Sequence, residues 1–295
     1  MEGKNNEVQP YKLKYYLDTN AVRSFAPHLK RCREVGAFTS IWTICEMLGR
    51  VLKNPKDFYK IQKNFIGIKD SHICVVSKLP MELHYDAFSI LPSVEPFSNE
   101  ILNLVLILID SKSYDDWLSQ VSLHDIDGTL NFINEIDNAT DHFNDSLQTH
   151  FDTSKSSRES IEEYKDFVAQ EDKNLSHKRL VEYFVDCFIE MSSDVRKMGV
   201  YLGFTYEKFK EFLCNAYNGS IDVAIRVNAC IVNRKVSYKD RCAKNDDIDM
   251  MHLYYLQDDI ILVSNDKMLL DNVNAEFPGR AISNDDFKKI LDSVS

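Results

Sequence analysis

The sequence has few glycines, few prolines and no long hydrophobic run. Nine Gly and seven Pro in 295 residues exclude collagen-like, proline-rich and wholly disordered chains. The longest apolar block, from Ile101 to Ile109 and interrupted by Asn103, is shorter than the roughly 20 residues needed to cross a bilayer. We therefore expect no membrane partner.

Cysteine usage and the N-terminal residues favour a reducing compartment. Seven Cys is an odd number, and no two of them have the C-x-x-C spacing. Residues 1–17 are polar and lack the apolar stretch of a secretory signal. These absences argue against a disulfide framework and a zinc ribbon, and they predict a cytoplasmic protein.

The net charge of −11 is unevenly distributed along the chain. Residues 110–172 carry 16 acidic and four basic side chains, whereas residues 1–75 carry 13 basic and seven acidic ones. A basic surface attracts phosphate backbones and an acidic one repels them, so the N-terminal part is the candidate nucleic-acid surface. The alternative is two solvated surfaces that differ in charge.

Short apolar strands are predicted near both ends of the chain, with helical periodicity between them. The expected strands are 15–17, 36–39, 260–263 and 280–282, and the expected helices include 21–33, 97–109, 123–150, 158–191, 205–217, 221–235 and 246–256. This order predicts an α/β fold with a parallel sheet flanked by helices. Residues 1–79 and 216–295 would form one discontinuous domain, and residues 80–215 a helical, acidic insertion.

Four acidic residues stand where a parallel sheet would place a site. Asp18 and Asp266 each follow an apolar strand, and ligands bind beyond the carboxyl ends of such strands. Glu46 lies on the apolar face of an expected helix, and Asp249 opens another. An all-oxygen cluster suits Mg²⁺ or Mn²⁺, which serve in-line phosphodiester hydrolysis.

Each of these acids also has a purely structural interpretation. Asp18 and Asp266 could cap helices, and Glu46 could pair with Arg50 one helical turn later. Asp249 could be a first-turn acid favoured by the helix dipole. His252, on a helix near the acids, is expected to be packed or hydrogen-bonded rather than a ligand, since hard ions prefer oxygen.

Four short motifs, in this order, resemble those of PIN-domain nucleases. They are Tyr16-Leu17-Asp18-Thr19-Asn20, the stretch from Thr39 to Leu48 that contains Glu46, Asp249-Met250-Met251-His252-Leu253, and Val263-Ser264-Asn265-Asp266-Lys267. The resemblance covers about residues 13–65 and 240–285. It implies a PIN-like fold and a divalent-metal-dependent endoribonuclease that hydrolyses single-stranded RNA.

The resemblance also assigns roles to individual residues. Asp18, Glu46, Asp249 and Asp266 match the catalytic, metal-binding acids, with Asp246 and Asp247 left open as alternatives for the third position. Asn20 and Ser264 match polar positions that orient those acids. Independently of the resemblance, the basic N-terminal helices, with Arg23, Lys30, Arg31 and Arg33, would gather phosphates by their charge.

The family context suggests a biological role and leaves others open. Many stand-alone bacterial relatives are toxins, which implies a toxin or defence effector with a neutralising protein partner. The alternative is a catalytically inactive PIN-like scaffold that binds RNA or protein. The RNA target and a homo-oligomeric state stay undecided at this point.

Overall fold

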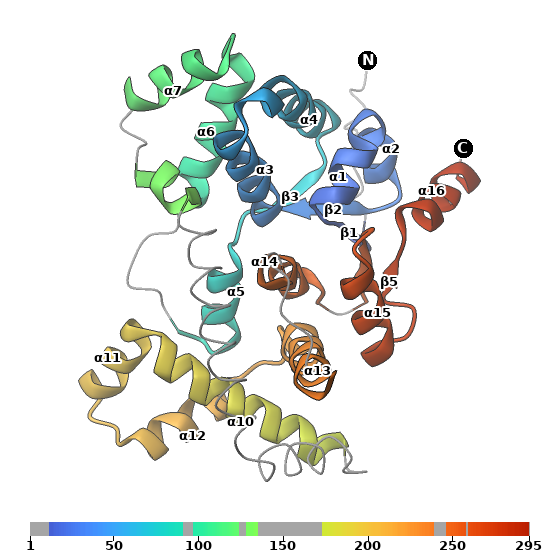
Figure 1. The fold of residues 1–295 in the computed structure, drawn as a ribbon. Helices are drawn as coiled ribbons and strands as arrows, with labels where there is room; N and C mark the ends of the chain where they lie inside the picture. Colours follow the sequence, from blue (N-terminus) through green and yellow to red (C-terminus); the bar gives the residue numbers. More distant parts are fainter. Residues whose placement is uncertain are drawn as a thin grey trace, which may run out of the picture.

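A computed structural model describes residues 12–90, 97–123, 128–134, 173–238, 246–257 and 259–294. Five strands form one parallel sheet in the order β3-β2-β1-β4-β5 (Figure 1). The strands are β1 (Tyr15–Leu17), β2 (Ala37–Ser40), β3 (Cys74–Val76), β4 (Ile261–Val263) and β5 (Ala281–Ile282). Because β1 to β3 come from one end of the chain and β4 and β5 from the other, both ends build the sheet, and the predicted α/β class is confirmed.

The strands before Asp18 and Asp266 are direct neighbours in this sheet. Leu17 of β1 pairs with Val263 of β4, although some 240 positions separate them. The N–H of Asp18 donates to the carbonyl of Val263 at 3.3 Å, which continues the ladder past the end of β1. All three β1 residues are buried, as expected for a central strand covered by helices on both faces.

The N-terminal helices lie between β1 and β3, and one of the predictions for them needs correction. They are α1 (Thr19–Phe25), the 3₁₀ turn η1 (Ala26–His28), α2 (Leu29–Glu34), α3 (Ile41–Lys53), η2 (Pro55–Asp57) and α4 (Phe58–Ser71). The single helix expected over 21–33 is wrong: it is divided at η1. Pro27 lies in that turn and has no N–H to continue the α-helical hydrogen bonds.

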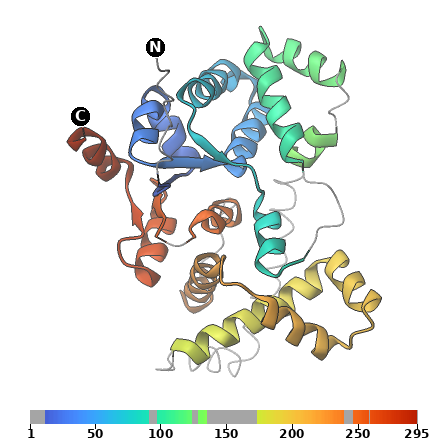
Figure 2. The same ribbon diagram turned by 180° about the vertical axis from the view of Figure 1, so that it is seen from behind.

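The labelled helices between β3 and α14 (Asp246–Met251) pack on different parts of the molecule. They are α5 (Pro80–Ala87), α6 (Ser98–Asp110), α7 (Tyr114–Leu123), α10 (Lys173–Met191), α11 (Ser193–Tyr201), α12 (Tyr206–Ala216) and α13 (Asp222–Tyr238). Helix α6 packs on α3 and α4, whereas α10 packs on α11, α12 and α13. The two views place α6 and α7 at one end of the molecule and α10 to α12 at the other (Figures 1 and 2).

The region expected as one insertion therefore packs in two different surroundings. Helix α6 lies on the N-terminal helices α3 and α4, whereas α10 lies on α11, α12 and α13. The boundaries at 79 and 216 remain a prediction. Most of the acidic segment lies outside the described residues. The part outside them, residues 124–127 and 135–172, includes much of the helices expected at 123–150 and 158–191. None of the helices that the structure describes is both long and apolar enough to cross a membrane.

The C-terminal part returns the chain to the sheet. It contains α14 (Asp246–Met251), η3 (His252–Tyr255), α15 (Lys267–Glu276) and α16 (Asn284–Ser293). The helix expected over 246–256 therefore changes to 3₁₀ geometry at His252. This change buries the ring of Tyr255 against that of Tyr16 in β1, with ring centroids 5.2 Å apart.

Candidate active site

Asp18 lies at the carboxyl end of β1 and begins α1. Its side chain is 3% exposed, and Oδ1 accepts the Ala21 N–H at 2.7 Å, so it caps this helix. Burial raises its pKa, because a charged carboxylate loses its water. The charge of His252 and hydrogen bonds from Ser264 and Ala21 oppose this rise. Asp18 is therefore a buried carboxylate that its surroundings only partly compensate.

Asp266 occupies the corresponding place after β4. Its Oδ1 accepts the Leu269 N–H at 2.8 Å and caps α15, while its own N–H donates to Ser264 Oγ at 2.9 Å. Ser264 is fully buried and also hydrogen-bonds to Asp18. One hydroxyl therefore connects the two strand-end acids, in the orienting role expected for Ser264.

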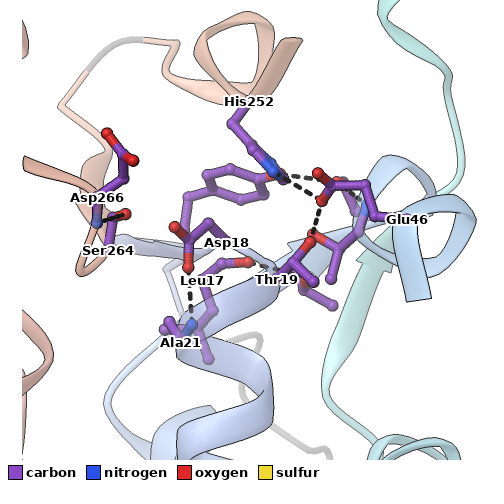
Figure 3. A network of polar contacts seen from close by, with 12 residues as sticks. Leu17, Asp18, Thr19, Ala21, Glu46, His252, Ser264 and Asp266 are labelled. Atoms are coloured by element: carbon purple, nitrogen blue, oxygen red, sulfur yellow. Dashed lines mark hydrogen bonds and ion pairs between the residues drawn. The ribbon is translucent and has the colours of Figure 1, made fainter. Parts of the chain in front are cut away.

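Glu46 enters the site from the second turn of α3. Its Oε2 accepts the Thr19 hydroxyl and lies 2.9 Å from His252 Nε2. The expected alternative, a pair with Arg50, is not formed, because Arg50 Nε lies 2.6 Å from Asp57 Oδ2 instead. Glu46 is thus directed toward the end of β1, where Figure 3 shows Asp18 between Asp266 and Glu46.

His252 connects Glu46 to a buried chain of hydroxyl groups. Its side chain is 2% exposed, and Nδ1 lies 2.6 Å from the Tyr16 hydroxyl, which lies 2.8 Å from Ser40 Oγ. Burial alone would lower the pKa of His252, but Tyr16 and the Glu46 carboxylate raise it well above its usual value. A protonated ring would donate to Glu46 and to the Tyr16 hydroxyl, which would then donate to Ser40 Oγ.

Asp249 is the third acid expected from the sequence, and its pKa depends on burial and on the charges of its neighbours. Burial raises its pKa to about 7, and the negative charges of Glu46, Asp266 and Asp18 add to this rise. Such coupling requires the four carboxylates to share one region of the molecule. The side chains of Asp246 and Asp247 lie outside the described residues. Asp249 therefore stays the candidate for the third acid, because its pKa responds to the charges of the other three acids.

The carboxylate oxygens of the site are suitable ligands for a divalent ion, but their present positions do not form a metal site. No three or more His, Cys, Asp or Glu side chains in the described ranges are arranged to hold a metal ion. Oxygen ligands nevertheless suit Mg²⁺ and Mn²⁺, and the raised pKa of Asp249 marks an excess of negative charge that a cation would relieve. One carboxylate oxygen each of Asp18, Glu46 and Asp266 already accepts hydrogen bonds from the protein.

The other residues expected from the sequence occupy different surroundings. Asn20 is exposed. Among the basic residues, Lys30 is exposed, whereas Arg31 donates to the Leu291 carbonyl at 2.8 Å and thereby joins α2 to the end of α16. Arg31 therefore has a structural role in addition to its charge.

Tyr16, Thr19 and Ser40 were not expected to contribute polar contacts to the site. Tyr16 has the pattern of a core strand residue, and Ser40 that of a helix cap, which it also is. His252 is hydrogen-bonded as expected. Comparisons with protein-family models, curated proteins and solved structures found no match for this chain.

Proposed function

We propose that this chain is a PIN-like, metal-dependent endoribonuclease that hydrolyses phosphodiester bonds in single-stranded RNA. The observation that carries the proposal is the pairing of β1 with β4, which places Asp18 and Asp266 just beyond the ends of two neighbouring parallel strands. Ligands bind beyond such strand ends, and the charges of Glu46, Asp266 and Asp18 all add to the raised pKa of the buried Asp249, which supports a shared region for the four acids. The order of the four motifs and the all-parallel sheet support the same family.

The residues of the chain have distinct tasks in this proposal. Asp18, Glu46, Asp249 and Asp266 would hold one or two ions, whose chemistry is to activate water and to stabilise the leaving oxygen. Ser264 orients Asp18 and Asp266 through its single hydroxyl. Thr19 and His252 fix the carboxylate of Glu46 from two directions.

His252 supplies a positive charge on the Glu46 side of the acids. The charge of His252 opposes the rise in the pKa of both Asp18 and Asp249, so it favours their ionised forms. A hard cation would act in the same direction. We infer that His252 keeps the carboxylates ionised and oriented for the ion, without being a ligand itself.

The experiment is cleavage of an end-labelled single-stranded RNA with Mn²⁺, with Mg²⁺ and with EDTA. Asp266→Asn preserves shape and removes one charge, so cleavage should fall by orders of magnitude. Asp271→Asn is the matched control, because Asp271 is an exposed acid on the same helix. Cleavage that continues in EDTA, or equal rates for the wild type and Asp266→Asn, would show the proposal to be wrong.

A second candidate is a PIN-like scaffold that binds RNA or protein without cutting. It is favoured by one observation: Glu46 already has protein partners, and no group of acids in the described ranges is arranged as a finished metal site. Thermal unfolding with Mn²⁺ distinguishes the two. A nuclease site should gain stability by mass action and lose that gain in Asp266→Asn, whereas a scaffold should gain none.

The broader role is proposed on the family resemblance alone. A toxin or defence effector of this class would act on cellular or foreign RNA and would need a neutralising protein partner. Co-purification of a partner that abolishes cleavage would support this role. If the protein purified from its native host cleaves RNA as fast as the protein purified in the absence of other host proteins, no neutralising partner is bound. That result would count against the role.

A further inference from the structure

Helices α1 and α3 run side by side away from the acidic site. Thr19 in the first turn of α1 contacts Glu46 in α3. One helical turn further along, about 5.4 Å, these two helices carry Arg23 and Arg50. Both spacings are i to i+4, so each arginine lies on the same face of its helix as the site residue before it.

Arg23 is half-buried, and one nitrogen of its guanidinium group is enclosed without an acceptor in the described part of the chain. Its Nε is buried and has no hydrogen-bond partner among the described residues. Burial and the positive charge of nearby Arg50 lower its pKa, and Asp57 only partly offsets them. An arginine placed here for packing alone would be expected to find an acceptor, because an unsatisfied buried donor costs stability.

Arg50 provides the second cation at this place. Its Nε contacts Asp57 at 2.6 Å, and its side chain remains 44% exposed. Asp57 pairs with Arg50 and only partly offsets the positive charge around Arg23, so an excess of positive charge lies one helical turn from Thr19 and Glu46. Guanidinium groups bind phosphate through paired N–H donors, so one phosphate would be bound by the terminal nitrogens of both arginines.

We propose that Arg23 and Arg50 form a phosphate subsite that binds the RNA backbone beside the bond to be cut. The subsite rests on the proposed ribonuclease function for its role, but its geometry is independent of the metal. An RNA is favoured over a protein partner because the excess charge is positive and lies one turn from a site of phosphodiester chemistry. The subsite would position the substrate and would take no part in bond cleavage.

Binding is measured first, by fluorescence anisotropy of a labelled single-stranded RNA in EDTA at several salt concentrations. Arg23→Gln with Arg50→Gln should raise Kd about tenfold or more, as expected when charged hydrogen bonds are removed. The slope of log Kd against log salt should fall by about 0.7 for each phosphate that the protein no longer neutralises. Arg196→Gln, an exposed arginine on α11, is the matched control and should leave both values unchanged.

Arg23→Lys with Arg50→Lys guards against a folding defect. This variant keeps both charges but loses the planar fork, so it should keep the salt slope and bind more weakly than the wild type. A double glutamine variant that unfolds at the wild-type temperature and binds RNA with the wild-type Kd and salt slope would overturn the subsite. Equal weakening by Arg196→Gln would overturn it as well.

A scan with single neutral methylphosphonate linkages then locates the phosphate that the two arginines bind. In the wild type, one linkage near the cut should raise KM several-fold while kcat changes little, and in the double glutamine variant the same linkage should have no further effect. Cleavage parameters that respond additively to the linkage and the variant would overturn the proposal. If no RNA is cut but binding still depends on both arginines, the ribonuclease function is wrong and the subsite stands.

Discussion

His252 Nε2 lies 2.9 Å from Glu46 Oε2, and both groups are largely buried. The same ring meets the Tyr16 hydroxyl at 2.6 Å on its other side. The His252 ring is thus enclosed between a carboxylate and a phenol at the end of the central strand. This pair links the acidic site to the core, because Tyr16 is fully buried in β1.

Replacement of His252 by Gln should destabilise the protein in a pH-dependent manner. The folded pKa is raised, so its stabilising effect is fully present below about pH 6.5 and is lost as pH rises through the folded value. Removing one partner of a buried pair typically costs about 3 kcal/mol. Urea denaturation of both proteins should show the largest difference near about pH 6 and a smaller one in alkali. A pH-independent difference would contradict this account.

Asp249→Asn should stabilise the metal-free protein at alkaline pH. The folded pKa of about 7 exceeds the ordinary value, so the folded state loses stability as pH rises from about 4 to about 7. We expect a gain of roughly 2 kcal/mol for the variant near pH 8, with partial exposure taken into account. The gain should disappear near about pH 4, where the carboxyl is protonated in both states.

Control measurements for Asp249→Asn use Asp271→Asn, which changes an exposed acid. Its free energy of unfolding should match that of the wild type at both pH values. A loss of stability in Asp249→Asn near pH 8 would show that Asp249 is not repelled by its neighbours. Added Mn²⁺ should reverse the order of the two proteins, because only the wild type would retain the complete set of acids.

His84 should make the fold sensitive to mild acid. It is buried among aromatic rings, with Phe188 stacked at 3.9 Å, and Nε2 has no hydrogen-bond partner among the described residues. Burial lowers its pKa to about 3, so the folded state loses stability as pH falls below about 6.5. Relative to the wild type, His84→Leu should gain roughly 2 kcal/mol between about pH 6.5 and about pH 5. His28→Gln, at an exposed position, should show no such trend.

Gly36 tests how tightly β2 enters the sheet beside β1. Its φ is +83°, and a Cβ there would lie 2.4 Å from the Lys12 carbonyl oxygen. Gly203 also has a positive φ, of +69°, but a Cβ there would meet nothing within 4 Å. Gly36→Ala should therefore cost about 2 kcal/mol more than Gly203→Ala in thermal or urea unfolding. Equal costs would mean that the backbone at Lys12 moves aside easily.

The sheet was largely predictable because its central strands have strong local signals. Tyr15–Leu17 and Ile261–Val263 are wholly apolar, and each is followed by an acid that caps a helix. β3 (Cys74–Val76) was not predicted. It is a three-residue edge strand with an exposed Cys74, so neither burial nor alternation marks it in the sequence.

The four acids could be predicted, but their partners could not. Each acid follows a local rule, at a strand end or on a helix face. The contacts of Glu46 with Thr19 and His252 join segments far apart in the chain, and only tertiary packing determines them. The same holds for the hydroxyl of Ser264, whose bond to Asp18 depends on the pairing of β1 with β4.

The central claim is that Asp18 and Asp266, at the ends of two neighbouring strands, act as parts of one metal-dependent site. Single-turnover cleavage of single-stranded RNA with Mn²⁺ tests it for the wild type, Asp18→Asn, Asp266→Asn and the double variant. Each single change should lower the rate by orders of magnitude, and the double change should lower it little further, because groups that act as a unit are not additive. A wild-type rate for Asp18→Asn, or full wild-type activity in EDTA, would contradict the claim.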